Sequence, residues 1–251
     1  MLFRSLGLEW DEGPIIGGPN APYFQTERKD HYLTWAKKLI LAGRAYVDDT
    51  SAEKIDDYRK QGQAAKIPYL YRNHRPKNAE KNPEENLALI GLGHPIRFKT
   101  IPKDYTWHDE VMGDLKTGPE VLDDIILIKK DGLPTYNFAH IIDDAEMGVT
   151  HIARGVEYLS SMPNYLALYE ALGLEHPLFL SLPHILAPTG NKKLGKRDGA
   201  KSVTEYRDDG ILPEAMLNYL ACLGWNDGTE QEIYPKSELI KAFSKIGRAH
   251  V

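Results

Sequence analysis

The sequence contains very little cysteine: Cys222 is the only one among 251 residues. A single thiol excludes an intramolecular disulfide framework and any zinc site built from several cysteines. The sequence also lacks a run of eighteen apolar residues, so we expect no membrane-spanning helix. Its N-terminus has neither a long apolar stretch nor a cleavage site, so we expect no secretory signal. These absences together favour a protein of the reducing cytoplasm.

The chain also lacks an excess of positive charge, since its formal net charge at pH 7 is −5. This argues against unspecific coating of nucleic acid, but it leaves room for local basic patches. The chain does have 42% apolar residues, which is enough for a real core. A length of 251 residues fits one large domain or two smaller ones.

The segment GNKKLGKRDGAKSV, residues 190–203, is one such local basic patch. Gly190, Gly195 and Gly199 would let its backbone bend closely around a ligand. Positioned cations are the main help that a protein can give to reactions of polyphosphates. The segment is therefore either a phosphate-binding loop or a solvent-exposed basic loop, and its spacing alone favours the exposed loop.

Hydrophobic periodicity predicts the first elements of the chain. A helix is expected over residues 26–42, with Thr26 as its cap and Gly43 at its end. The polar stretch 51–66 predicts a second helix. The apolar runs on either side of Asp131-Gly132 predict two strands that meet at a tight turn.

Residues 135–190 alternate strand, helix and strand, which is typical of a parallel α/β unit. The two strands are expected within 150–155 and 179–188, and the helix between them begins at Pro163 and ends at Gly173. Pro213 begins a further helix that ends at Gly224. Its inward-facing residues are expected to be Met216, Leu217, Leu220 and Leu223.

A basic stretch with interleaved aromatic residues covers residues 67–83. Arg72, His74 and Arg75 lie there among tyrosines, a combination that suits phosphate contact and base stacking. The alternative is a solvated loop with its tyrosines packed underneath, and composition alone favours that simpler interpretation.

Four motifs follow one another along nearly the whole chain. They are SLGLEWDEGP with GGPNAPYFQTER (5–28), DGLPTYNFAHIIDDAEMGVTHIARGVEYLSS (131–161), KLGKR (193–197) and YRDDGILPEAMLNYLACLGW (206–225). In this order they resemble the bacterial-type glutamyl-tRNA synthetase, a class I aminoacyl-tRNA synthetase, with KLGKR in the place of its lysine-serine-lysine signature loop. The resemblance implies that glutamate and ATP form a glutamyl-adenylate, whose glutamyl group then passes to the 3′ end of the tRNA.

The resemblance also implies a fold class. This is an α/β fold with a Rossmann-like parallel-sheet core that lacks its first strand. An inserted α+β domain binds the tRNA acceptor end, and a C-terminal helical segment contacts the stem. The implied ranges are 1–47 and 126–190 for the two parts of the core, 48–125 for the insertion, and 191–251 for the signature loop and helical segment.

Residues of the catalytic site are implied by the same resemblance. Lys193 and Lys196 match the lysines that stabilise the triphosphate of ATP, which arrives with Mg2+, and Gly195 replaces the usual serine between them. The nucleotide set also includes Glu157, together with His184 and Ile185, which match the segment that packs on adenine.

The glutamate pocket is implied to contain Tyr136, His140, Arg154, Glu157 and Tyr158. An arginine suits this task because its fixed, always-charged fork matches a carboxylate in a way that lysine cannot copy. The alternative for Arg154 is an ion pair with Asp143 or Asp144.

The residues implied to contact tRNA are all basic. Because some relatives bind zinc in the insertion through cysteines and this chain has none there, we expect no zinc and no other protein-bound metal. The implied tRNA contacts are Arg72, Arg75, Arg97 and Lys99 in the insertion, and Lys201 and Arg207 in the helical segment.

The chain departs from the family pattern at both ends. The family's first strand, its histidine-rich ATP signature and its helical anticodon-binding region have no counterpart here, and the final residues 246–251 do not resemble the family. We therefore expect a truncated core with weak or no activity alone, and self-association through the sheet edge that the first strand would cover. The alternatives are a glutaminyl-type or base-modifying, glutamyl-transferring paralogue, and a non-catalytic RNA-binding remnant.

Overall fold

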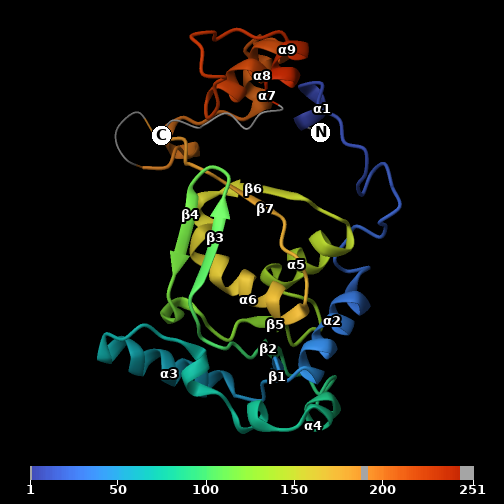
Figure 1. Ribbon diagram of the computed structural model, residues 1–251, viewed down its shortest axis with the longest axis vertical. Coiled ribbons are helices and arrows are strands. Elements are labelled where there is room, and N and C mark those ends of the chain that lie inside the picture. The colour runs from blue at the N-terminus through green and yellow to red at the C-terminus, as the bar shows by residue number, and fades with distance from the viewer. Residues whose placement is uncertain (1, 188–191, 244–251) are drawn as a thin grey trace.

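The computed structural model describes residues 2–187 and 192–243, without the side chains of residues 2, 3 and 196. Helices and short 3-10 helices surround two sheets, and the C-terminal helices stand at one end of the molecule beside the N-terminal helix (Figure 1). The α-helices are α1 (Leu2–Ser5), α2 (Lys29–Leu41), α3 (Ala52–Ala65), α4 (Pro83–Ala88), α5 (Tyr136–Glu146), α6 (Met162–Leu172), α7 (Val203–Asp208), α8 (Pro213–Cys222) and α9 (Lys236–Phe243). The 3-10 helices are η1 (Tyr71–His74), η2 (Lys77–Glu80), η3 (Pro119–Val121), η4 (Val156–Ser161) and η5 (Lys196–Asp198).

The main sheet has the strand order β4-β3-β7-β6 and is mixed. Its β6 and β7 are parallel, with His151 opposite Leu178 and Gly155 opposite Leu182, and α6 connects them, so the predicted parallel α/β unit is confirmed. A second sheet, with all neighbours antiparallel, has the order β1-β2-β5. The strands are β1 (Ala45–Val47), β2 (Ile96–Phe98), β3 (Tyr105–Asp109), β4 (Gly113–Thr117), β5 (Ile126–Ile128), β6 (His151–Gly155) and β7 (Leu178–Leu182).

The β3–β4 hairpin lies within the expected insertion, yet it pairs with the main sheet. Its contact with β7 is a short parallel one, with Asp109 opposite Phe179. The fully buried Asp109 carboxylate accepts hydrogen bonds from the backbone N–H groups of Val111, Met112 and Ser181. One side chain therefore holds the hairpin against β7. The main sheet thus combines strands from the expected insertion, 48–125, with strands from the expected core segment 126–190.

A buried polar network joins α2 to α5 inside the main core. Arg28, only 3% exposed, donates to Asp143 at 2.8 Å and to Glu146 at 2.5 Å. Tyr32 from α2 donates to the same Asp143. Since a buried guanidinium needs such partners, this network fixes where α5 lies against α2.

Two helix predictions need correction. The first helix begins at Lys29 rather than Thr26, because residues 24–28 form turns that end in Arg28. The second strand expected after Asp131-Gly132 is instead the helix α5, which buries Phe138, Ala139, Ile141 and Ile142 at helical spacing. The tight turn itself is present, since the N–H of Gly132 donates to the carbonyl of Lys129 at 2.9 Å.

The helix at Pro213 is confirmed, but its expected inward face is only partly buried. Met216 is 7% exposed, whereas Leu220 and Leu223 are 39% and 41% exposed. These two leucines line a hollow instead of a core. Across residues 2–187 and 192–243, no helix is long and apolar enough to cross a membrane.

Candidate functional site

Arg154 lies near the C-terminal end of β6 inside a cage of rings. Its guanidinium carbon is 4.9 Å from the ring centres of Tyr158 and Tyr165 and 6.0 Å from that of Phe179. Its Nη2 donates to the sulfur of Met162 at 2.9 Å. Within the described residues no carboxylate pairs with it, so the guanidinium keeps its fork available for an anion.

The two carboxylates suggested as alternative partners of Arg154 are engaged elsewhere. Asp143 accepts from Arg28 and from Tyr32. Asp144 accepts from Nδ1 of His140 at 3.2 Å. The alternative interpretation, an ion pair of Arg154 with Asp143 or Asp144, is therefore wrong.

Tyr136 and His140 form the wall of α5 that faces this cage. The ring of Tyr136 lies 5.1 Å from that of His140 and 5.9 Å from that of Tyr158. Partial burial and the neighbouring Tyr158 raise the pKa of Tyr136, although about half of its side chain is exposed, while the Arg154 cation opposes the shift. The phenol therefore stays protonated near neutral pH and can donate a hydrogen bond. The four predicted residues Tyr136, His140, Arg154 and Tyr158 thus lie together.

Glu157, three residues after Arg154, links this region to the basic loop. Its carboxylate accepts from Nζ of Lys193 at 2.9 Å, and its other oxygen lies 3.7 Å from Nδ1 of His184. The lysine, as the largest influence, lowers the pKa of Glu157. The predicted nucleotide residues Glu157, His184 and Lys193 are therefore neighbours in the structure.

The basic loop starts from a short antiparallel pairing. The N–H of Ala187 donates to the carbonyl of Lys192, and the N–H of Leu194 donates to that of Ile185, both at 2.8 Å. Residues 188–191 between them, and the side chain of Lys196, lie outside what the structure describes. Lys192 pairs with Asp198 at 2.9 Å, so this cation is used within the loop.

A hollow of about 440 Å³ lies between the loop and the C-terminal helices. Its polar side consists of Glu157, His184, Lys193 and Lys201. The remaining wall is largely apolar, so the hollow has a cationic, polar side and an apolar side. That apolar wall includes Leu182, Ile185, Leu194, Val203, Met216, Tyr219, Leu220 and Leu223.

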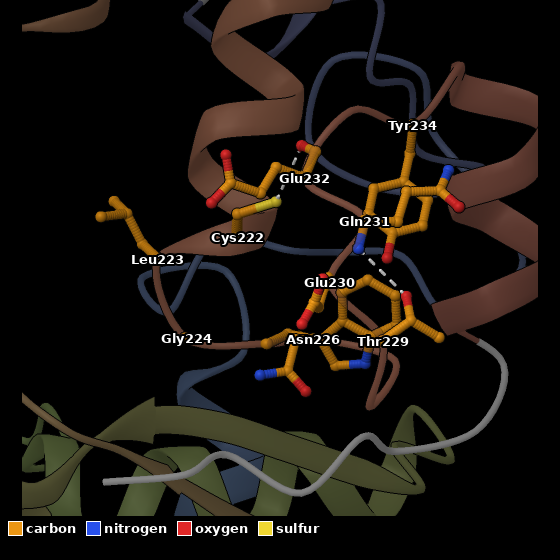
Figure 2. Close-up of a pocket in the computed structure, with 10 residues that line it drawn as sticks. Cys222, Leu223, Gly224, Asn226, Thr229, Glu230, Gln231, Glu232 and Tyr234 are labelled. Atoms are coloured by element: carbon orange, nitrogen blue, oxygen red, sulfur yellow. Dashed lines mark hydrogen bonds between the residues drawn. The ribbon is translucent and has the colours of Figure 1, made fainter.

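A second hollow, of about 400 Å³, lies between the end of α8 and the loop that follows it (Figure 2). Sequence reasoning gave no indication of it, and none of the predicted site residues lines it. Trp225, which lines it, packs against Tyr234 and Phe243, so the indole belongs to the small core of the C-terminal helices. Cys222 at its edge points its thiol toward the carbonyl of Glu232 at 3.6 Å (Figure 2).

Two of the arginines expected to contact tRNA have internal partners instead. Arg97 is 7% exposed, donates to Asp48 at 2.6 Å and lies 3.6 Å from the ring centre of Tyr71. Arg75 grips the fully buried Asp124 with two nitrogens, at 2.6 and 2.8 Å. Because Arg97 is buried, its expected contact with tRNA is corrected to a structural role. Arg75 uses two of its nitrogens to bind Asp124.

The other basic residues of that set pair with backbone carbonyls or exposed carboxylates rather than with buried carboxylates. Arg72 donates to the carbonyl of Pro119 at 2.6 Å, and Lys99 donates to that of Ala79 at 2.5 Å. Lys201 pairs with Asp209 and Arg207 with Asp208, both on exposed surface. Exposed pairs of this kind are weak enough to open for a phosphate.

No group of three His, Cys, Asp or Glu side chains in the described part of the chain could hold a metal ion. The expectation that the protein carries no zinc therefore remains a prediction.

Comparison with known proteins gives one consistent picture. Residues 2–249 match the family described as "tRNA synthetases class I (E and Q), catalytic domain". The glutamate–tRNA ligase of Clostridium botulinum strain Hall is 45% identical over 95% of this chain and 49% of its own length. Glutamate–tRNA ligase 2 of Rubrobacter xylanophilus is 41% identical over 96% of this chain and 48% of its own length.

Solved structures agree with the curated relatives. The glutamate–tRNA synthetase of Elizabethkingia anophelis superposes with a TM-score of 0.84 at 36% identity, over 96% of this chain and 53% of that one. A glutamate tRNA ligase of Elizabethkingia meningosepticum, solved in complex with its amino acid, gives a TM-score of 0.85, again at 36% identity and the same coverage. This chain spans about half the length of the curated relatives that it matches.

Proposed function

The chain belongs to the catalytic-domain family of the class I tRNA synthetases for glutamate and glutamine, and on this basis we propose that it serves the ATP-dependent attachment of glutamate to tRNA. Its fold is the α/β class I catalytic fold with a mixed sheet. The relatives with 41–45% identity are glutamate–tRNA ligases, which favours glutamate over glutamine as the amino acid.

One observation supports the proposal: a guanidinium without a carboxylate partner and the carboxylate that holds a loop lysine lie three residues apart at the C-terminal end of β6. Arg154 lies in the strand, and Glu157, which holds Lys193, follows within four residues. An acidic amino acid and a polyphosphate need cations at neighbouring points, because the reaction joins a carboxylate to the α-phosphate of ATP.

In the proposed pocket, Arg154 binds a carboxylate of glutamate with its fork. Tyr136 donates its phenolic hydrogen, since its raised pKa keeps it protonated. Tyr158 and His140 complete the wall, and these rings shield part of the ion pair from water, although Tyr136 itself is half exposed. Partial shielding strengthens the attraction between guanidinium and carboxylate.

In the proposed nucleotide site, Lys193 and Lys196 neutralise phosphate charge as the α–β bond breaks. Lys193 must leave Glu157 to do so, and an ion pair this exposed costs little to open. His184 and Ile185 line the adenine side, beside the apolar wall of the hollow. Mg2+ carried by the phosphates would neutralise further charge.

We also propose that residues 48–125 hold the tRNA acceptor end, between core segments 1–47 and 126–190, and that 191–251 contact the stem. Four basic residues support this contact because no buried carboxylate pairs with them in the described structure: Arg72, Lys99, Lys201 and Arg207. The buried pairs of Arg75 and Arg97 stabilise the same region from within. The cytoplasmic location expected from the sequence stays a prediction.

Self-association through β6 is a further part of the proposal. In the described part of the chain β6 pairs only with β7, which leaves its other edge without a strand partner. Such edges tend to be covered or paired with another chain. Light scattering over a range of concentrations tests this, and a monodisperse monomer at the highest concentration refutes it.

Glutamate-dependent exchange of pyrophosphate into ATP tests the function. Because this sequence spans about half of its relatives, the assay uses it within a chain of their full length, beside this chain alone. We expect exchange with glutamate in the longer chain and very weak or no exchange in the shorter one. Exchange with glutamine but not glutamate would show that the amino acid is wrongly assigned.

A further inference from the structure

His140 lies between two tyrosine rings beside the cage of Arg154. Its ring centre is 4.6 Å from that of Tyr165, edge to face at 83°, and 5.1 Å from that of Tyr136. Its side chain is only 11% exposed. Tyr165 is also one of the rings against Arg154. The imidazole and the guanidinium therefore share a wall, although their residues come from different elements.

The hydrogen bond to Asp144 determines which nitrogen of His140 carries the proton. Nδ1 lies 3.2 Å from Oδ2 of Asp144, and an ionised carboxylate can only accept, so Nδ1 is the donor. Nε2 is buried and has no hydrogen-bond partner among the described atoms. In the neutral ring this leaves Nε2 as a bare acceptor, whereas the charged ring donates from both nitrogens.

We propose that His140 selects between an acidic and an amide side chain, and that binding of glutamate brings a proton onto Nε2. The inference rests on the proposed function, because it takes the amino acid to lie between Arg154 and α5. A carboxylate oxygen against a bare Nε2 would set two acceptors face to face. The proton taken from solvent turns this contact into a charge-assisted hydrogen bond. The amide of glutamine can donate to Nε2 with no proton uptake.

The groups around His140 support this coupling. Asp144 on α5 accepts from Nδ1, and the guanidinium of Arg154 on β6 shares the ring of Tyr165 with the imidazole. The rings that lie against His140 are those of Tyr136 on α5 and Tyr165 on α6. Burial raises the pKa of Tyr165, so it stays a neutral phenol near pH 7. An anion bound between Arg154 and α5 would therefore set a hydrogen-bond acceptor against the unpartnered Nε2 of His140.

The first test reads the tautomer in the chain as it exists. Long-range proton–nitrogen NMR spectra of 15N-histidine-labelled protein distinguish the two neutral forms, and His140→Gln identifies the signal. We expect the Nδ1–H form without ligand, the doubly protonated form with saturating L-glutamate, and no change of form with L-glutamine. A proton on Nε2 in the ligand-free neutral ring, or glutamate binding without a change of form, overturns the inference.

The second test measures binding of the two amino acids against pH by calorimetry. One linked proton weakens glutamate binding by up to about tenfold per pH unit on the alkaline side, and glutamine binding stays flat. In Asp144→Asn the amide can donate to Nδ1, which moves the proton to Nε2, so the dependence for glutamate should become shallow. His31→Gln is the matched control, since His31 also faces a carboxylate through Nδ1, that of Glu146 at 3.1 Å, but on exposed surface.

The outcomes separate the inference from the proposed function. If neither amino acid binds at any pH, the glutamate pocket itself is refuted. If both bind with the same pH dependence, the pocket stands and the role of His140 is refuted. The wild-type spectra and titrations decide the question even where a variant fails to fold.

Discussion

Replacing Arg154 by alanine tests the glutamate pocket most directly. Its guanidinium lies among Tyr158, Tyr165 and Phe179, donates to the sulfur of Met162 and has no carboxylate partner in the described structure. Removal of the guanidinium therefore breaks no ion pair of the ligand-free protein. We expect the variant to fold and the loss to fall on the binding of glutamate.

The size of the loss follows from the charge and the surroundings of the lost contact. Hydrogen bonds to charged groups contribute about 1.5–3 kcal/mol, and a fork makes two of them to one carboxylate. Taking about 3 kcal/mol for the pair, since such contributions do not add fully, the KM for glutamate should rise roughly 150-fold. Arg154→Lys keeps the charge but loses the planar fork and its stacking, so we expect about a tenfold rise.

The assay is glutamate-dependent pyrophosphate exchange in a chain of the relatives' full length. The KM for ATP should stay unchanged, because Arg154 packs on aromatic rings and Met162 in the described structure, whereas Glu157 holds the loop lysine Lys193. Arg59→Ala is the matched control, as an exposed arginine over the ring of Tyr69 in the expected insertion. An unchanged KM for glutamate in Arg154→Ala, or a full rescue by lysine, would refute the reasoning.

Three further predictions concern rate, stability and pH. In the same exchange assay, Lys196→Ala should lower the rate about 10²–10³-fold with little change in glutamate KM, because its cation acts mainly in the transition state; a rise in KM at constant rate contradicts this. Asp124→Asn should lower the free energy of unfolding by roughly 3 kcal/mol in urea titrations, because it weakens the buried partner of Arg75 and Tyr46, whereas Asp114→Asn, 92% exposed, should change little. Burial alone would raise the pKa of Asp48, but hydrogen bonds from Thr50, Arg97 and Tyr71 outweigh this effect and lower it. Its stabilisation is therefore complete above the unfolded pKa near 3.8 and is lost as pH falls through the lower folded value. Asp48→Asn should thus be less stable at neutral pH and should lose less stability on acidification; equal losses would contradict this.

The parallel unit around β6 and β7 could be predicted from the sequence because its signals are local. Pro163 and Gly173 bound α6, and the short apolar runs on both sides have strand length. The sequence predicts a strand in place of α5 because the segment follows a real turn and its first seven residues are mostly apolar. Its spacing of Phe138, Ala139, Ile141 and Ile142 is helical, and that periodicity was the signal to weigh.

The basic residues of the insertion show why composition cannot locate a binding surface. The carboxylates that engage Arg75 and Arg97 lie 49 positions away along the chain. Nothing near either arginine in sequence indicates these partners, and only the folded chain brings them together. A predicted nucleic-acid contact is therefore best supported where the cation pairs only with an exposed carboxylate, as Lys201 and Arg207 do.

The site differs from the insertion because its key residues are close in sequence as well as in space. Residues 154–158 carry Arg154 toward one ligand and Glu157 toward the loop lysine of the other. A strand end that passes directly into a 3-10 helix turns successive side chains in different directions, so one short segment can face two ligands. Motif order can identify such a segment, since no distant partner decides its geometry. The choice between an acid and an amide instead depends on Asp144 and His140 one helical turn apart, which only the hydrogen bond between them could reveal.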